Sequence, residues 1–351
     1  MHSENQRRRR AVLGWLGAPA LAALAGCGGG SSSASTDTLR QAQRVAPRVT
    51  RDDPPRRRAQ AFERRGITAI VTSADGSAMG VTHTDGRVML LDSQGHETRT
   101  LQPAGSAVCV GLVFSADGRL LVGVGRDGLA LGWGVDSGAR RFTLRGHDHG
   151  LRAVASGARG AVVVTGGEGA RVLSWDGNNG QLRQVMHAGD FINALSVSPD
   201  GRLVASGCAD ARVLVWDSAS GKLLFTLRGH AGELSAVSFS PDARQIASAG
   251  NDGKVLIWDV ASGQQIQALA GQRAPLRSLA FNTDGSLLAG GGQSGQVLVW
   301  DSATHDVVQD LTGSTTAVNA LVFDALGHNQ LLAGNEDSQL LSWVLPARGA
   351  R

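Results

Sequence analysis

The hydrophobic pattern of this chain is clearest over residues 222–259. Apolar and polar residues alternate there in short runs, and turn residues separate the runs: Pro241-Asp242-Ala243 and then Asn251-Asp252-Gly253. Strict alternation between closely spaced turns is typical of consecutive antiparallel strands, and the stretch has no helical period. The pattern therefore predicts an all-β segment.

The same segment recurs along the chain in a fixed phase. The intervals between successive tryptophans are 42, 41, 42, 42 and 43 residues, for Trp133, Trp175, Trp216, Trp258, Trp300 and Trp343. Leu91 takes the tryptophan position one unit earlier, which makes seven units. A period near 40 residues that ends in Trp-Asp marks a blade of a β-propeller. We predict an all-β, seven-bladed propeller whose blades are four-stranded antiparallel sheets.

With these motifs, residues 58–345 resemble WD40-repeat proteins. In that family a His, a Ser or Thr, an Asp and the Trp of one repeat form a hydrogen-bonded network. The resemblance implies the complete set His230, Ser248, Asp252 and Trp258 in unit five. In unit four it implies His187, Ser206, Asp210 and Trp216, with the histidine displaced by one residue, and in unit three only His147, Thr165 and Trp175. A buried Asp in a turn needs donors, so the set is scaffold and not chemistry.

The last unit lacks a fourth strand of its own. Its third strand ends near Trp343, and the tail 346–351 is too short and too rich in Pro and Gly to supply another. An open sheet edge exposes unpaired backbone groups. We therefore predict that residues 58–63, just before the first strand of unit one, pair beside residues 339–344 and close the ring.

The sequence pI of about 9.6 comes from the amino-terminal part of the chain. Residues 1–66 carry 13 of the 34 basic and 5 of the 30 acidic residues, which leaves 21 basic and 25 acidic residues in the repeats. Binding to nucleic acid needs clustered Lys and Arg on the folded surface. The mildly acidic repeat region argues against a nucleic-acid partner.

Residues 1–26 have the features of an export signal. Arg7 to Arg10 precede an apolar stretch, residues 11–26, which is too short for a membrane span and suits a signal peptide. Leu24-Ala25-Gly26-Cys27 resembles the lipobox of bacterial lipoproteins, which implies acylation of Cys27; a plain secreted protein is the alternative. The arginine run also resembles a twin-arginine export signal, and an ordinary basic region remains open.

Residues 27–57 follow as a Gly-, Ser-, Pro- and Arg-rich tether that cannot build a core. Gly28 after the cysteine resembles lipoproteins sent to an outer membrane. We therefore expect a lipid-anchored protein of the bacterial cell envelope that faces the periplasm or the cell surface.

Candidate chemistry is sparse. Residues 123–128 match G-x-G-x-x-G, but in a strand-turn-strand and without the helix that a dinucleotide site needs. His147, His149 and His187 could seed a zinc site, although two of them are assigned to the networks; we predict no metal and no cofactor. Cys109 and Cys208 lie on different units and are expected as buried thiols. No catalytic motif stands out, so a non-enzymatic protein is favoured over a hydrolase or lactonase that acts through the channel.

In WD40 proteins the usual docking surface is the ring face formed by the loops that join neighbouring blades, the loops between the second and third strands, and the start of the innermost strand. The matching positions form the predicted protein-binding face: Arg126, Arg152, Glu168, Phe191, Asn193, Glu233, Asn251, Arg277, Asn319 and Glu336. We expect a monomeric scaffold for protein–protein contacts. An envelope-assembly factor that handles exposed strands is a further alternative. The sequence names no partner.

Overall fold

The computed structural model describes residues 57–61, 66–101, 108–157, 162–269, 274–325 and 329–346. All of them belong to one compact unit, Pro47–Arg351. The predicted signal peptide, Cys27 and the tether up to residue 56 lie outside the described residues, as do Phe62 and Glu63 of the predicted closing segment.

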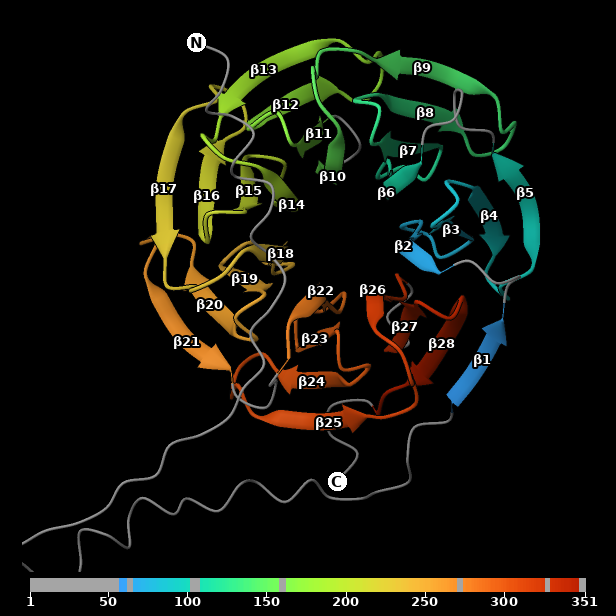
Figure 1. Ribbon diagram of the computed structural model, residues 1–351, viewed down its shortest axis with the longest axis vertical. Helices are drawn as coiled ribbons and strands as arrows, with labels where there is room; N and C mark the ends of the chain where they lie inside the picture. Colours follow the sequence, from blue (N-terminus) through green and yellow to red (C-terminus); the bar gives the residue numbers. More distant parts are fainter. Residues whose placement is uncertain are drawn as a thin grey trace, which may run out of the picture. The chain divides into compact units, whose positions relative to one another are not determined.

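The described residues form twenty-eight strands and no helix, arranged as seven antiparallel four-stranded sheets. The prediction of the fold is therefore confirmed. Figure 1 shows the sheets as blades around a centre, with one strand of each blade innermost. From the inner to the outer strand, blades one to four are β2 (Ile67–Thr72), β3 (Ala78–His83), β4 (Val88–Asp92), β5 (Glu97–Leu101); β6 (Cys109–Phe114), β7 (Leu120–Gly125), β8 (Ala130–Gly134), β9 (Arg140–Leu144); β10 (Leu151–Gly157), β11 (Val162–Gly167), β12 (Arg171–Asp176), β13 (Leu182–His187); and β14 (Ile192–Val197), β15 (Leu203–Cys208), β16 (Arg212–Asp217), β17 (Leu223–Arg228). Blades five to seven are β18 (Leu234–Phe239), β19 (Gln245–Gly250), β20 (Val255–Asp259), β21 (Gln265–Leu269); β22 (Leu276–Phe281), β23 (Leu287–Gly292), β24 (Val297–Asp301), β25 (Val307–Leu311); and β26 (Val318–Phe323), β27 (Gln330–Asn335), β28 (Gln339–Val344), β1 (Arg57–Ala61).

A Ser-x-Asp sequence sets the turn between the first two strands of most blades. In blade four the Ser198 hydroxyl donates to Asp200 at 2.6 Å, and the Leu203 N–H donates to Ser198 Oγ at 2.9 Å. Gly201 completes this turn at φ 75°, a left-handed conformation that favours glycine. The Asp of each Trp-Asp pair has a similar task at the next turn: Asp217 accepts the N–H and the hydroxyl of Ser220. These aspartates shape turns and do not join the tryptophan network.

The hydrophobic core lies between neighbouring blades. One cluster joins Val172 and Met186 of blade three to Ile192 and Trp216 of blade four, all nearly inaccessible to solvent. Equivalent clusters lie between the other neighbouring blades. Each blade is therefore stabilised chiefly by the blades beside it.

Strand β1 closes the ring beside β28, as the sequence predicted. The two strands pair antiparallel from Arg57↔Trp343 to Ala61↔Gln339. The amino-terminal end of the propeller thus completes the blade that its carboxyl-terminal end begins.

Candidate functional site

The innermost strand of every blade has an irregularity near its start. The pairing register between the first two strands shifts by one residue there, after Ile67, Cys109, Leu151, Ile192, Leu234, Leu276 and Val318. The extra residue of such a β-bulge is released from the ladder, which re-aims its side chain. The seven bulge residues are Thr68, Val110, Arg152, Asn193, Ser235, Arg277 and Asn319.

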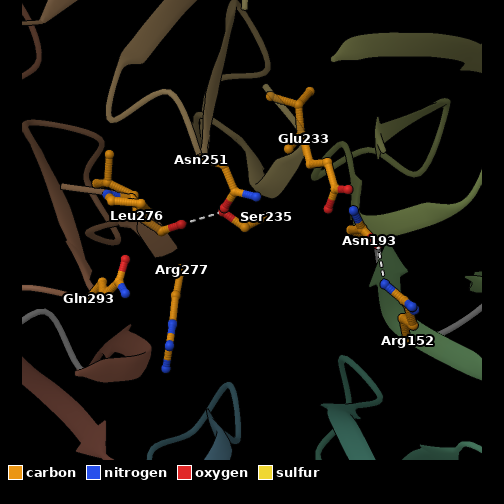
Figure 2. Close-up of a pocket in the computed structure, with 10 residues that line it drawn as sticks. Arg152, Asn193, Glu233, Ser235, Asn251, Leu276, Arg277 and Gln293 are labelled. Carbon is orange, nitrogen blue, oxygen red and sulfur yellow. Dashed lines mark hydrogen bonds between the residues drawn. The ribbon is translucent and has the colours of Figure 1, made fainter. Parts of the chain in front are cut away.

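Four of these bulge residues line a pocket on one ring face, across blades three to six. The pocket encloses about 640 Å³, and its complete lining is Arg152, Asn193, Glu233, Leu234, Ser235, Asn251, Pro275, Leu276, Arg277 and Gln293. Figure 2 shows Arg152 and Asn193 at one side of the pocket, Arg277 and Gln293 at the other, and Asn251 near Ser235. A cavity that presents amides and charged groups together can form hydrogen bonds with a polar ligand.

Arg152 is held by partners from two blades. Its Nε and Nη2 donate to Glu168 Oε1 at 3.2 and 3.0 Å, and its Nη1 donates to Asn193 Oδ1 at 2.9 Å. The guanidinium also lies 5.8 Å from the centroid of the Phe191 ring, which is a cation–π distance. Phe191 is nevertheless 44% exposed. The group therefore presents a fixed charge beside an accessible aromatic ring.

Arg277 is held in a similar way at the other side of the pocket. Its Nη1 donates to Asn319 Oδ1 and to Glu336 Oε1, both at 2.5 Å. The Asn319 amide in turn donates to the Ile67 carbonyl oxygen at 2.8 Å. These bonds link blades six, seven and one, so Arg277 both faces the pocket and stabilises the ring.

The structure thus brings together most of the predicted binding face. Arg152, Asn193, Glu233, Asn251 and Arg277 line the pocket. The two arginines of the pocket contact four more predicted residues: Arg152 contacts Glu168 and Phe191, and Arg277 contacts Asn319 and Glu336. Arg126 is exposed in the turn after β7 of blade two and is not among the lining residues.

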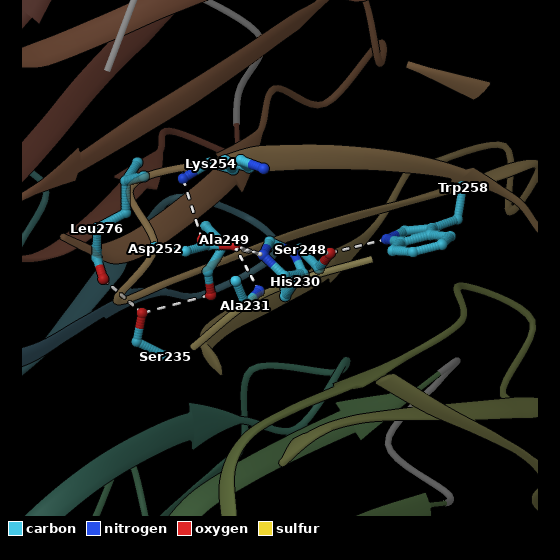
Figure 3. A network of polar contacts seen from close by, with 9 residues as sticks. All are labelled: His230, Ala231, Ser235, Ser248, Ala249, Asp252, Lys254, Trp258 and Leu276. Atoms are coloured by element: carbon cyan, nitrogen blue, oxygen red, sulfur yellow. Dashed lines mark hydrogen bonds and ion pairs between the residues drawn. The ribbon is translucent and has the colours of Figure 1, made fainter. Parts of the chain in front are cut away.

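Blade five contains a complete four-residue network, shown in Figure 3. Trp258 Nε1–H donates to Ser248 Oγ at 2.7 Å, and Ser248 Oγ lies 2.8 Å from His230 Nε2. His230 Nδ1 lies 2.9 Å from Asp252 Oδ2. Because indole is only a donor, the serine proton goes to Nε2, and the imidazole proton on Nδ1 goes to the carboxylate.

Blades three and four have partial versions of this network. In blade three, Trp175 and His147 each contact Thr165 Oγ1 at 2.8 Å. In blade four, Trp216 donates to Ser206 at 3.3 Å.

The displaced His187 does not join the blade-four network, which corrects the sequence-based assignment. It is exposed at the end of β13, opposite Arg171, and Asp210 instead pairs with Arg212. The strand register gives the reason: His187 lies opposite Arg171 as Arg228 lies opposite Arg212, so His187 takes the place of Arg228 and not of His230. Gly189, which has no side chain, occupies the position that corresponds to His230.

Burial sets the protonation states of the complete network. It lowers the pKa of His230 below its usual value, and the attraction of Asp252 opposes this only partly. Burial acts to raise the pKa of Asp252, yet hydrogen bonds from Ala231, Lys254 and His230 outweigh it and lower the pKa. Burial, with Arg171 nearby, lowers the pKa of His147 to about 4. Neutral histidines at neutral pH fit the donor directions given above.

The remaining sequence candidates have structural roles. His147 is bound to Thr165, and Asp148 pairs with Arg171; within the described ranges no cluster of three or more His, Cys, Asp or Glu could hold a metal. Cys109 and Cys208 are buried free thiols, and burial raises the pKa of both to about 12. Residues 123–125 are the end of β7, and residues 126–128 lie in the turn that follows. No described segment forms a helix long and apolar enough to span a membrane.

Comparison with protein-family models gives three adjacent matches. Residues 180–217, 221–259 and 263–301 match the family WD40: WD domain, G-beta repeat. The chain thus carries WD40 repeats. Each matched WD40 repeat begins just before the outermost strand of one blade and ends with the third strand of the next, for example β17 to β20. Compared with curated proteins, the chain has no significant match.

Sequence reasoning missed five residues of the pocket: Leu234, Ser235, Pro275, Leu276 and Gln293. The repeat phase could have found two of them. Ser235 lies 42 residues after Asn193 and 42 before Arg277, and Gln293 lies 42 after Asn251. Pro275 and the two leucines carry no polar signal and belong to the pocket only through backbone geometry.

Proposed function

We propose that this protein is a membrane-anchored, non-enzymatic scaffold of the bacterial cell envelope, and that it binds protein partners on the ring face around the pocket. Acylated Cys27 anchors it, and the propeller faces the periplasm or the cell surface as a monomer. The observation that carries the binding role is the pocket between the two arginine groups, with exposed Phe191 beside it. The WD40 repeats support the same class of function, since such propellers usually scaffold protein contacts.

The chemistry of the pocket favours a peptide segment of a folded partner. The amides of Asn193, Asn251 and Gln293 can each donate and accept, as backbone peptide groups require. Phe191 offers the kind of large apolar anchor that dominates the energetics of many interfaces. The two arginines are already paired with carboxylates. Glu233 also lines the pocket and is exposed, so its carboxylate is accessible to a partner.

Site-specific photo-crosslinking in intact cells tests the binding face. A photoreactive residue at Phe191 or Glu233 should give a discrete higher-mass adduct. The same residue at Asp306, an exposed turn position of blade six, is the matched control and should give none. Equal adducts at all three positions would refute the assignment of this face.

A charge variant measures the contribution of the pocket itself. Glu233→Lys should weaken capture of the crosslinked partner at least tenfold with an unchanged melting temperature, whereas Asp306→Lys should change neither. Arg152 and Arg277 are less suitable for substitution because they also join blades. Unchanged capture by Glu233→Lys would exclude the pocket as the docking site.

The anchor is tested separately. Cys27→Ala should move the protein from the membrane to the soluble envelope fraction and abolish incorporation of a labelled fatty acid. Retention of the variant in the membrane fraction would contradict the lipid anchor and leave the ring-face assignment untouched.

A further inference from the structure

The outermost strands of blades one to six share an apolar residue that blade seven lacks. In each of these blades a Leu or Met lies opposite a buried residue of the third strand: Leu101 opposite Val88, Leu144 opposite Ala130, Met186 opposite Val172, Leu227 opposite Val213, Leu269 opposite Val255, and Leu311 opposite Val297. All six are buried except Leu269, which is half-buried. The position thus fixes the outer strand to the core.

In blade seven the corresponding residue of β1 is Gln60, which lies opposite Leu340. Gln60 is only half-buried, whereas Leu340 is buried. A polar side chain therefore covers an apolar third strand at the one seam where the ring closes. Since burial of a leucine side chain stabilises a strand against the core, β1 lacks a contribution that the other outer strands have.

The contact with the neighbouring blade changes in the same way. In blade two, Leu144 lies beside the turn glycine of blade three, so that a Cβ at Gly180 would meet Leu144 Cδ2 at 2.9 Å. Gln60 occupies the equivalent place over Gly95 of blade one and donates to its carbonyl oxygen at 2.9 Å. One partly exposed hydrogen bond thus replaces an apolar contact.

Two further features distinguish this edge. The third and fourth strands of the other blades are joined by a turn, whereas β1 reaches β28 from the other end of the propeller sequence. Val344, at the end of β28, is 55% exposed, the largest value among the exposed large hydrophobic residues described. The edge of β28 is therefore both less tightly covered and more apolar than its equivalents.

We infer that the outer position of blade seven is a strand-acceptor site: β1 is releasable, and β28 takes in its place an extended segment of a partner protein that carries Leu or Met opposite Leu340. The released edge offers a row of backbone N–H and C=O groups, which extended peptides bind by strand addition. The six other outer strands define what fits this position. This site is on the circumference of the ring and is independent of the ring-face pocket.

The competition between the two strands is quantitatively feasible. A strand tethered in the same chain acts at an effective concentration in the millimolar range. Replacement of Gln by Leu at the apolar position favours the incoming strand about tenfold or more. A partner strand can therefore compete with β1 at concentrations well below those of the tethered strand.

The test uses the full chain and a fluorescent peptide with the sequence of residues 222–229, KLLFTLRG, taken from the outer strand of blade four. The matched control peptide has Gln at the position of Leu227. We expect the leucine peptide to bind at least tenfold more tightly than the control, by fluorescence anisotropy. A photoreactive group on the leucine peptide should crosslink to residues 339–344.

The variant Gln60→Leu supplies the second control. It leaves β28 intact and strengthens β1, so it should weaken binding of the leucine peptide at least tenfold and slow hydrogen exchange in residues 339–344. No binding of the leucine peptide at about 1 mM, equal binding of both peptides, or unchanged binding by Gln60→Leu would each overturn the inference. Dimers that form at high protein concentration and vanish in Gln60→Leu would assign the position to β1 of a second copy and overturn the partner assignment.

Discussion

Blade five and blade seven have the same four-stranded pairing but are stabilised differently. Blade five contains the full network from Trp258 to Asp252, with the side chains of His230 and Asp252 only 1% and 7% exposed. In blade seven Ala333 replaces the serine of that network. There Asn335 instead donates to Ser314 at 3.1 Å and to Gln339 at 3.2 Å. The outer strand of blade five, β21, follows β20 directly along the chain, whereas the outer strand of blade seven is β1, from the other end of the propeller sequence.

The difference shows which interactions the blade architecture requires. Both blades form apolar clusters with their neighbours, although Gln60 interrupts the apolar positions of blade seven, and only blade five has the complete network. A blade therefore forms from inter-blade packing and strand pairing, and the polar network adds local stability to a sheet that already exists. Four changes test this difference between the blades: deletion of the closing strand, substitution of the tryptophans, substitution of the turn carboxylates, and a change of pH that protonates the histidines.

Removal of the closing strand should have the largest effect. Deletion of residues 58–63 takes away the strand paired with β28. Backbone hydrogen bonds are worth about 1 kcal/mol each, so we expect a loss on the order of 3–5 kcal/mol in the free energy of unfolding, measured by denaturant titration. Deletion of residues 40–45 is the control of equal length and should have no effect. Equal stability of the two deletions would contradict closure by β1.

Tryptophan substitution separates packing from the network. Trp258→Phe and Trp343→Phe remove similar apolar volume from buried positions, but only the former also removes the donor to Ser248. We expect Trp258→Phe to destabilise the protein by about 1–2 kcal/mol more than Trp343→Phe, measured by thermal and denaturant unfolding. Equal losses would show that the indole hydrogen bond in blade five adds nothing.

Substitution of the turn carboxylates Asp252 and Asp337 should have a smaller effect on the free energy of unfolding, and the two effects should differ. Asp252 receives hydrogen bonds from His230, Ala231 and Lys254 and is buried, whereas Asp337 at the corresponding turn of blade seven is exposed. Asp252→Asn should therefore lower the free energy of unfolding by about 1.5–3 kcal/mol, measured by denaturant titration. Asp337→Asn should change it by no more than about 0.5 kcal/mol. A larger loss for Asp337→Asn would reverse the comparison.

The smallest effect is a pH dependence that blades three and five contribute and blade seven does not. The folded pKa of His230 is lowered, and that of His147 is lowered to about 4, so the unfolded chain binds protons first. The stabilisation by these neutral histidines is present above pH 6.5, near the pKa of histidine in the unfolded chain, and is lost as the pH falls toward 4.

We expect a loss of about 1 kcal/mol over that range, measured as the melting temperature against pH. The double variant His147→Gln, His230→Gln should flatten the curve between these values, while His187→Gln leaves it unchanged. The lowered pKa of Asp75, Asp200 and their equivalents acts only below this range. A curve that His147→Gln, His230→Gln does not flatten would exclude the network histidines as its source.

Repeat spacing was sufficient to predict the number of blades, because a repeated local pattern encodes a repeated local structure. The closing strand was predicted from the tail after Trp343, which is too short to supply a fourth strand. The partners of Arg277 could not be predicted in this way. Asn319 lies one repeat of 42 residues further along the chain and Glu336 lies 59 residues further, and the spacing does not show which side chains of neighbouring blades bond to each other. The assignment of His187 failed for a different reason. The sequence shows a histidine near the right place, but not the strand register that gives it the place of Arg228.

The WD40 repeats are out of phase with the blades, since each spans the outer strand of one blade and three strands of the next. A gene duplication that copies one such unit therefore inserts strands that complete both flanking sheets. The ring can gain or lose a whole blade in one genetic event without leaving an orphan strand, and the angle between neighbouring blades is then what limits their number.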